Sequence, residues 1–182
     1  MIAVTAFTDT TLDGSGTVRI APIAYAGTGD SFTRADLVFT GVDHSSLSYE
    51  VRVFFNRDDA TTGTPREPDE GYAGRIHVFG HGGCFGDVGH CDVPEPTGDP
   101  TDLRPPHQLT PLTTYLTVTA PLRRLLATGA GLTAVTLLTI SRPPWRPDRT
   151  SDPDLFRFGT VDLRTYRTPP ELTDPVPPPP TR

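Results

Sequence analysis

The residues best suited to chemistry gather in one stretch, residues 76–91, which reads IHVFGHGGCFGDVGHC. It holds three of the five histidines and both cysteines of the chain, set among five glycines. Imidazole nitrogen and thiolate sulfur are the ligands that suit copper and zinc. We therefore take this stretch as the candidate site. Its candidate metal ligands are His77, His81, Cys84, His90 and Cys91.

These ligands can meet only if the chain bends. Each residue of an extended strand advances about 3.3 Å, so His77 and His81 would lie about 13 Å apart on a straight strand. The glycines around His81 oppose a helix, which is the other way to bring residues four apart together. We expect a strand over residues 71–79 that runs into a glycine-shaped loop over residues 81–91, where turns fold the loop back on itself.

The two cysteines allow two interpretations. As ligands, Cys84 and Cys91 would bind one copper or zinc ion together with His81 and His90, because mixed thiolate and imidazole ligands suit Cu(I) or Zn(II). As a structural pair, they would be buried thiols or a local disulfide. Their spacing does not decide between these interpretations. A reducing cytosol would favour metal binding over a permanent bridge.

The other histidines are weaker candidates. His77 is expected to be a polar residue at the end of its strand. His44 lies in a DHSS turn and His107 in a proline-rich loop, so both are expected to be solvated. In the alternative of a mononuclear metalloenzyme, His44 or His107 would complete the set of ligands, and the connection over residues 92–111 would form one wall of a pocket.

Composition limits the class of protein. The chain has 182 residues and a net charge of −6, and its basic residues form no stripe, so neither nucleic acid nor a membrane surface is an expected partner. Its 21 prolines and 17 glycines favour short strands joined by turns. The first residues lack the basic start and apolar core of a signal peptide, which leads us to expect a cytoplasmic protein.

The pattern of apolar residues predicts an all-β fold, an antiparallel β-sandwich or flattened barrel with one short helix. Residues 49–56 give the clearest strand, with Tyr49, Val51, Val53 and Phe55 on the face that belongs in the core. The helix is expected over residues 121–128, with Thr119 as its cap and Gly129 at its end. The other expected strands are residues 17–24 (an edge strand, because of Pro22), 35–40, 71–79, 113–119, 132–140 and 155–163, the last with a bulge at Gly159.

Residues 1–167 are expected to form a single β-sandwich domain, in which the residues before 17 form a loose N-terminal segment. Residues 57–71, rich in Asp, Thr, Pro and Gly, are expected to be an exposed loop. Residues 168–182 end in PVPPPPTR and form a proline-rich tail that we expect to be disordered.

The order of these pieces resembles a known family. The segments VRVFFN (51–56), YAGRIHVFGH (72–81), a VTxxLxxL step (118–125) and AVTLL (134–138) are similar to the C-terminal, KFDV-type β-domain of polyphenol oxidases and tyrosinases. In that family the domain packs over a dicopper active site and controls access to it. The six histidine ligands of such a centre cannot come from the five histidines here.

The resemblance therefore implies a stand-alone accessory domain. It would bind copper, or zinc in its place, and shield or load a dicopper oxidase whose catalytic subunit or domain is separate. Loading copper, as a chaperone does, is suggested by analogy with fungal relatives that use a Cys-x-x-Cys pair. Two alternatives remain: a small mononuclear metalloenzyme that uses the loop 77–91, and a protein-interaction module without metal, with a Cys84–Cys91 disulfide. Whether the chain is an enzyme stays open.

Overall fold

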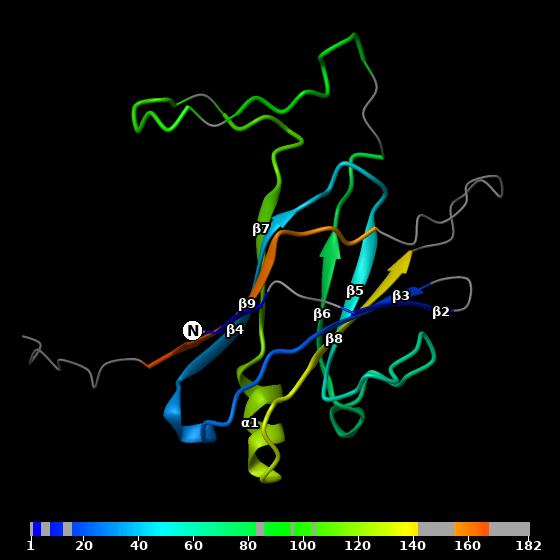
Figure 1. The fold of residues 1–182 in the computed structure, drawn as a ribbon, viewed down its shortest axis with the longest axis vertical. Coiled ribbons are helices and arrows are strands. Elements are labelled where there is room, and N and C mark those ends of the chain that lie inside the picture. Colours follow the sequence, from blue (N-terminus) through cyan, green and yellow to red (C-terminus); the bar gives the residue numbers. More distant parts are fainter. Residues whose placement is uncertain are drawn as a thin grey trace, which may run out of the picture.

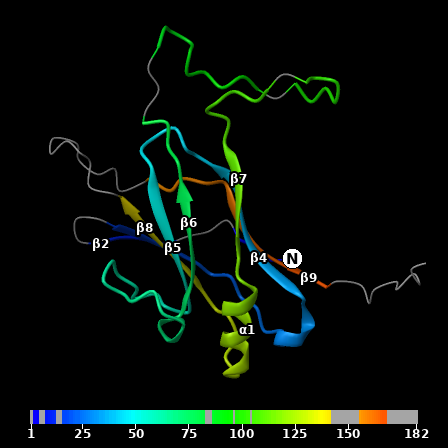
Figure 2. The ribbon, with the colours of Figure 1, turned by 180° about the vertical axis from the view of Figure 1, so that it is seen from behind.

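Two antiparallel sheets face each other in the computed structural model, which describes residues 2–4, 8–12, 16–82, 86–95, 97–103, 105–141 and 155–167. One sheet has four strands in the order β1-β9-β4-β7, and the other has five in the order β2-β3-β8-β5-β6. Figure 1 and Figure 2 show the two layers from opposite sides. The strands are β1 (Ile2–Val4), β2 (Thr8–Leu12), β3 (Gly16–Ala21), β4 (Arg34–Val42), β5 (Tyr49–Phe55), β6 (Tyr72–Val78), β7 (Leu112–Thr117), β8 (Val135–Ser141) and β9 (Thr160–Tyr166). The predicted all-β sandwich with one short helix is confirmed.

The core lies between the sheets. Side chains alternate between the two faces of each strand, and the apolar faces of the two sheets point toward each other. The predicted inner face of β5, which carries Tyr49, Val51, Val53 and Phe55, is buried as expected. It shares one cluster with Leu137 of β8 and with residues of the opposite sheet. Strand β8 lies between β3 and β5, so its prediction as a buried central strand is also confirmed.

The outer face of the five-stranded sheet carries a second, small apolar cluster made of Val18, Phe54, Ala60 and Leu138. Phe54 is completely buried although it points away from the main core. Ala60 reaches it from the connection between β5 and β6, so that connection is not simply an exposed loop. The connection also contains one short 3₁₀ helix, η2 (Pro68–Glu70).

The single α-helix among the described residues is α1 (Thr119–Ala127), and it closes one end of the sandwich (Figure 1). Leu122 is buried against the core, as its spacing predicted. The prediction that Thr119 caps the helix is wrong, because Val118 occupies the N-cap position. Thr119 Oγ1 instead accepts a hydrogen bond from the Ala35 amide at 2.9 Å. Gly129 follows the helix with a φ of 80°, which glycine tolerates best.

Three strand predictions need correction. The N-terminal segment before residue 17 is not loose throughout, because β1 pairs with β9 and β2 pairs with β3. The strand expected at 17–24 is not at an edge: β3 lies between β2 and β8, and Pro22 follows its last residue, where it removes no ladder hydrogen bond. The last strand begins at Thr160 instead of 155, and Gly159 precedes it, where its amide donates to the Thr40 carbonyl at 2.7 Å.

Residues 79–111 connect β6 to β7, and the described part of this segment extends away from the sandwich at the end opposite α1, as both ribbon views show. We call this segment the arm. Its described residues, 79–82, 86–95, 97–103 and 105–111, contain neither a strand nor a helix. The tail 168–182 and the turn around Pro143 lie outside the described residues. In the part of the chain that the structure describes, no helix has the length and apolar character to cross a membrane.

Candidate functional site

The pairing of β5 with β6 places His44 beside His81. Tyr49 pairs with Val78, so the residues before β5 and those after β6 continue side by side beyond the sheet. The His81 amide donates to the His44 carbonyl at 3.0 Å, and the Gly82 amide donates to the Ser46 carbonyl at 2.8 Å. The two imidazole rings therefore lie with their centroids 5.1 Å apart and their planes inclined by 57°.

Gly80 makes this close approach possible. A Cβ atom at this position would lie 2.0 Å from the Ser46 carbonyl oxygen and 2.5 Å from the Leu47 backbone. Because Gly80 has no side chain, the segment after Val78 can pack against the loop that precedes β5. The Gly80 amide also donates to Ser48 Oγ at 3.0 Å. The backbone that carries His81 is thus held by hydrogen bonds from three successive amides, those of Gly80, His81 and Gly82.

His44 is not the solvated histidine that its turn predicted, because only 6% of its surface is exposed. Its Nε2 atom lies 2.9 Å from the Thr110 carbonyl oxygen, at the base of the arm. The preceding residue, Asp43, accepts a hydrogen bond from the Ser45 amide and pairs with Arg157. Burial works to raise the pKa of Asp43, but these partners together lower it, so the residue stays anionic.

The neighbouring Tyr49 is held by the same loop. Its hydroxyl group donates a hydrogen bond to the Asp43 carbonyl oxygen at 3.2 Å. Burial raises the pKa of Tyr49 far above the usual value, and the negative charge of Asp43 adds to the shift. Tyr49 therefore serves as a neutral hydrogen-bond donor that ties the loop before β5 to the sandwich.

His90 and Cys91 lie farther along the arm, in a turn. The His90 amide donates to the Asp87 carbonyl at 3.0 Å, and the Asp92 amide donates to the Gly89 carbonyl at 3.1 Å. The glycines of this segment were expected to reverse the chain, and the turn confirms that expectation. The His90 ring lies against Gly86, where an added Cβ would come within 2.6 Å of it.

Cys91 is bonded in a disulfide. The sequence has one other cysteine, Cys84, which lies outside the described residues. A sulfur in a disulfide is no longer a thiolate, and the thiolate is the form that binds metal. In this oxidised state Cys91 is therefore a structural residue of the arm, as the disulfide interpretation expected. Metal ligation by this residue would require reduction first.

His77 faces solvent on β6, where its register partner is Glu50 of β5. Glu50 is the centre of a charge cluster: its carboxylate accepts a hydrogen bond from Arg52 Nε at 2.7 Å and lies 3.5 Å from a guanidinium nitrogen of Arg75. Burial works to raise the pKa of Glu50, but the hydrogen bond from Arg52 and the positive charges around it lower it. His77 is thus part of a polar outer face, as predicted.

The structure brings together some of the predicted ligands but not as one set. His44 and His81 are neighbours, and the Nε2 atom of His107 lies 3.2 Å from the His90 carbonyl oxygen. Within the described ranges, no three His, Cys, Asp or Glu side chains are grouped so that they could hold one ion. The metalloenzyme alternative allowed His44 to join the ligands of the loop, but the specific pairing of His44 with His81 depends on the register between β5 and β6, which the sequence pattern does not fix.

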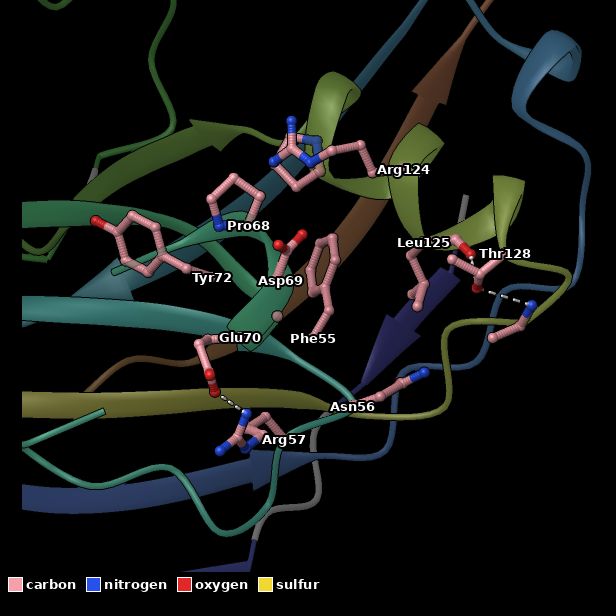
Figure 3. A pocket seen from close by; sticks show the side chains of 13 residues that line it. Phe55, Asn56, Arg57, Pro68, Asp69, Glu70, Tyr72, Arg124, Leu125 and Thr128 are labelled. Carbon is pink, nitrogen blue, oxygen red and sulfur yellow. Dashed lines mark hydrogen bonds and ion pairs between the residues drawn. The ribbon is translucent and has the colours of Figure 1, made fainter. Parts of the chain in front are cut away.

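A hollow of about 490 Å³ lies near the other end of the sandwich, where the end of β5 meets α1 (Figure 3). Phe55 and Leu125 give it apolar surface, and Arg57 and Glu70 form an ion pair at its edge. Arg124 and Asp69 project into the same region in Figure 3. Its lining residues include the carboxylates of Asp69 and Glu70 and the hydroxyl groups of Tyr72 and Thr128, but no cysteine, serine or histidine.

Comparison of the chain with known protein families and with curated proteins finds no match.

Proposed function

We propose that the chain is an accessory β-sandwich that docks onto a dicopper oxidase through the arm and shields its active site. The resemblance to the polyphenol oxidase C-terminal domain supplies the class of partner, and the sandwich architecture agrees with it. The observation that carries the proposal is the chemistry of the arm. Phe79 is 81% exposed, Leu103 is 90% exposed and Val88 is fully exposed, all on a segment that leaves the sandwich.

Contiguous exposed apolar surface marks interaction sites, and we infer that these three side chains form such a surface when the arm meets its partner. The prolines of the arm restrict its conformations before binding, which reduces the entropy that docking costs. The disulfide at Cys91 restricts the arm in the same way. Both features restrict the conformation of the arm before a partner binds.

Charge further defines the partner. Between residues 79 and 111 the sequence has five acidic residues and one arginine, so the arm contributes −5 + 1 = −4 to the net charge of −6. A surface that receives the arm should combine apolar pockets with basic side chains around them, because like charges opposed across an interface are costly. We therefore expect the oxidase to present a basic rim around its active-site entrance.

Copper would bind to the cysteines of the arm only in their reduced form. His81, His90 and His77 are exposed, and Cys91 and Cys84 would supply thiolates once a small-molecule thiol reductant has reduced the disulfide by two electrons and been oxidised in turn. Loading of copper into the partner would thus accompany reduction, whereas shielding would be the role of the oxidised protein. Zinc would occupy the same ligands if copper were absent.

The test uses the purified chain and the catalytic domain of a tyrosinase-type dicopper oxidase from the same genome. We expect the chain to bind this domain and to slow its oxidation of catechol. Replacement of Phe79, Val88 and Leu103 by Ser should abolish both effects. Tyr115→Ser is the matched control, because Tyr115 is 63% exposed but belongs to β7 of the sandwich and not to the arm. Equal inhibition by the triple variant, or no binding by the wild type, would refute the proposal.

A further inference from the structure

The His44–His81 pair has the separation of two imidazoles that share one metal ion. A metal–nitrogen bond of about 2.0–2.1 Å places each ring centroid about 3.2 Å from the ion, and a tetrahedral angle then puts the two centroids about 5.2 Å apart. The observed separation is 5.1 Å. The planes are inclined by 57°, so the rings are not stacked face to face.

The surroundings of His44 match those of a metal ligand. Histidines that bind metal usually direct their second ring nitrogen to a carboxylate or a backbone carbonyl, which fixes the tautomer. His44 Nε2 lies 2.9 Å from the Thr110 carbonyl oxygen. A carbonyl oxygen only accepts hydrogen bonds, so Nε2 carries a proton, and in the neutral ring Nδ1 is the nitrogen with the lone pair.

The second ring is accessible and its backbone is fixed. His81 is exposed, so its ring is accessible to an ion from solvent. The hydrogen bonds from the His81 and Gly82 amides hold the backbone beside the His44 loop. Preorganised ligands of this kind need little rearrangement when an ion binds.

We propose that His44 and His81 bind a divalent transition-metal ion, Cu²⁺ or Zn²⁺, through His44 Nδ1 and one nitrogen of the His81 ring, with water in the remaining positions. Imidazole suits both ions, and copper binds nitrogen ligands more tightly than zinc does. Two protein ligands leave open positions on the ion. The site lies where the arm begins, and it is separate from the cysteines.

This site does not depend on the docking role of the arm. It needs neither a reduced disulfide nor a partner, since both ligands and the Thr110 carbonyl belong to the folded chain. The metal assay uses the isolated oxidised protein, whereas the docking assay uses variants at Phe79, Val88 and Leu103. Failure of one therefore leaves the other intact.

The experiment titrates the oxidised full chain with ZnCl₂ or CuSO₄ by calorimetry. We expect one ion per chain, and His81→Ala should weaken binding at least about tenfold. His81 is exposed, so this variant should fold normally. His44→Gln should weaken binding to a similar extent, with its folding checked by thermal melting. The matched control is His107→Gln, at a histidine that belongs to neither proposed set of ligands, and this variant should bind as the wild type does.

Electron paramagnetic resonance of the Cu²⁺ complex provides a second measurement. The spectrum should show coupling to two imidazole nitrogens in the wild type and to one in His81→Ala. The proposal is overturned if the wild type binds neither ion, or if His81→Ala binds as tightly as the wild type does.

Discussion

The rings of Phe54 and Tyr72 meet edge-on across β5 and β6, with 5.5 Å between their centroids. Both lie on the outer face of the five-stranded sheet, where the connection between these strands folds over them and contributes Ala60. This contact gives the outer face an apolar centre of its own. The connection is therefore held by packing as well as by its turns.

Replacement of Phe54 by Ala should lower the free energy of unfolding by about 3–5 kcal/mol, because it leaves a cavity under the connection. Urea denaturation measures the change. Tyr115→Ala is the control, since this side chain is largely exposed and its loss should change stability little. A change below about 1 kcal/mol for Phe54→Ala would mean that the connection does not cover this face.

Asn56 fixes the chain after β5. Its φ is 50°, and its Oδ1 accepts hydrogen bonds from the amides of Thr133 and Ala134. We expect Asn56→Ala to destabilise the protein by about 1–3 kcal/mol, because it removes these bonds and tolerates the left-handed conformation poorly. Asn56→Asp retains the acceptor oxygen and should cost less. Equal losses for both variants in chemical denaturation would argue against this role.

Glu50 should make stability depend on pH. Its folded pKa is lower than the ordinary glutamate value of 4.5, so the folded state binds a proton less readily than the unfolded state does. The stabilisation is present above 4.5 and disappears as the pH falls through the folded pKa. Melting temperatures at about pH 7 and about pH 3 should therefore differ less in Glu50→Gln than in the wild type. Glu95→Gln, in the exposed part of the arm, should behave as the wild type does.

The disulfide at Cys91 should matter for the arm and little for the sandwich. Thiol titration of the denatured protein should detect no free thiol before reduction and both cysteines after it. Cys91→Ser should change the free energy of unfolding by less than about 1 kcal/mol, since the arm lies away from the core. Limited proteolysis should then cut the arm faster. A large loss of stability would show that the arm supports the sandwich.

Local patterns predicted the interior of the sandwich well. The alternation along β5 and the apolar run of β8 are dictated by burial, so the sequence alone indicates both the strands and the faces that enter the core. The helix α1 was found from its proline and its leucines. The turn at His90 followed from its glycines.

Features that depend on distant partners could not be predicted in this way. His44 looked like a solvated turn residue because its burial comes from Thr110 and from the loop after β6, which are far away in the sequence. Strands β1 and β2 are short, and the register with β9 and β3 defines them. Thr119 looked like a cap because the competing Ala35 amide belongs to another strand.

The pairing of β1 with β9 determines how the fold should respond to force. These are the first and last strands of the described sandwich, and they are antiparallel, with Ile2 opposite Leu163 and Val4 opposite Val161. Tension applied at Ile2 and Tyr166 therefore acts across the strands and loads their hydrogen bonds one after another. We expect the β1–β9 pair to separate one hydrogen bond at a time, and therefore at low force, when the chain is pulled from these two positions.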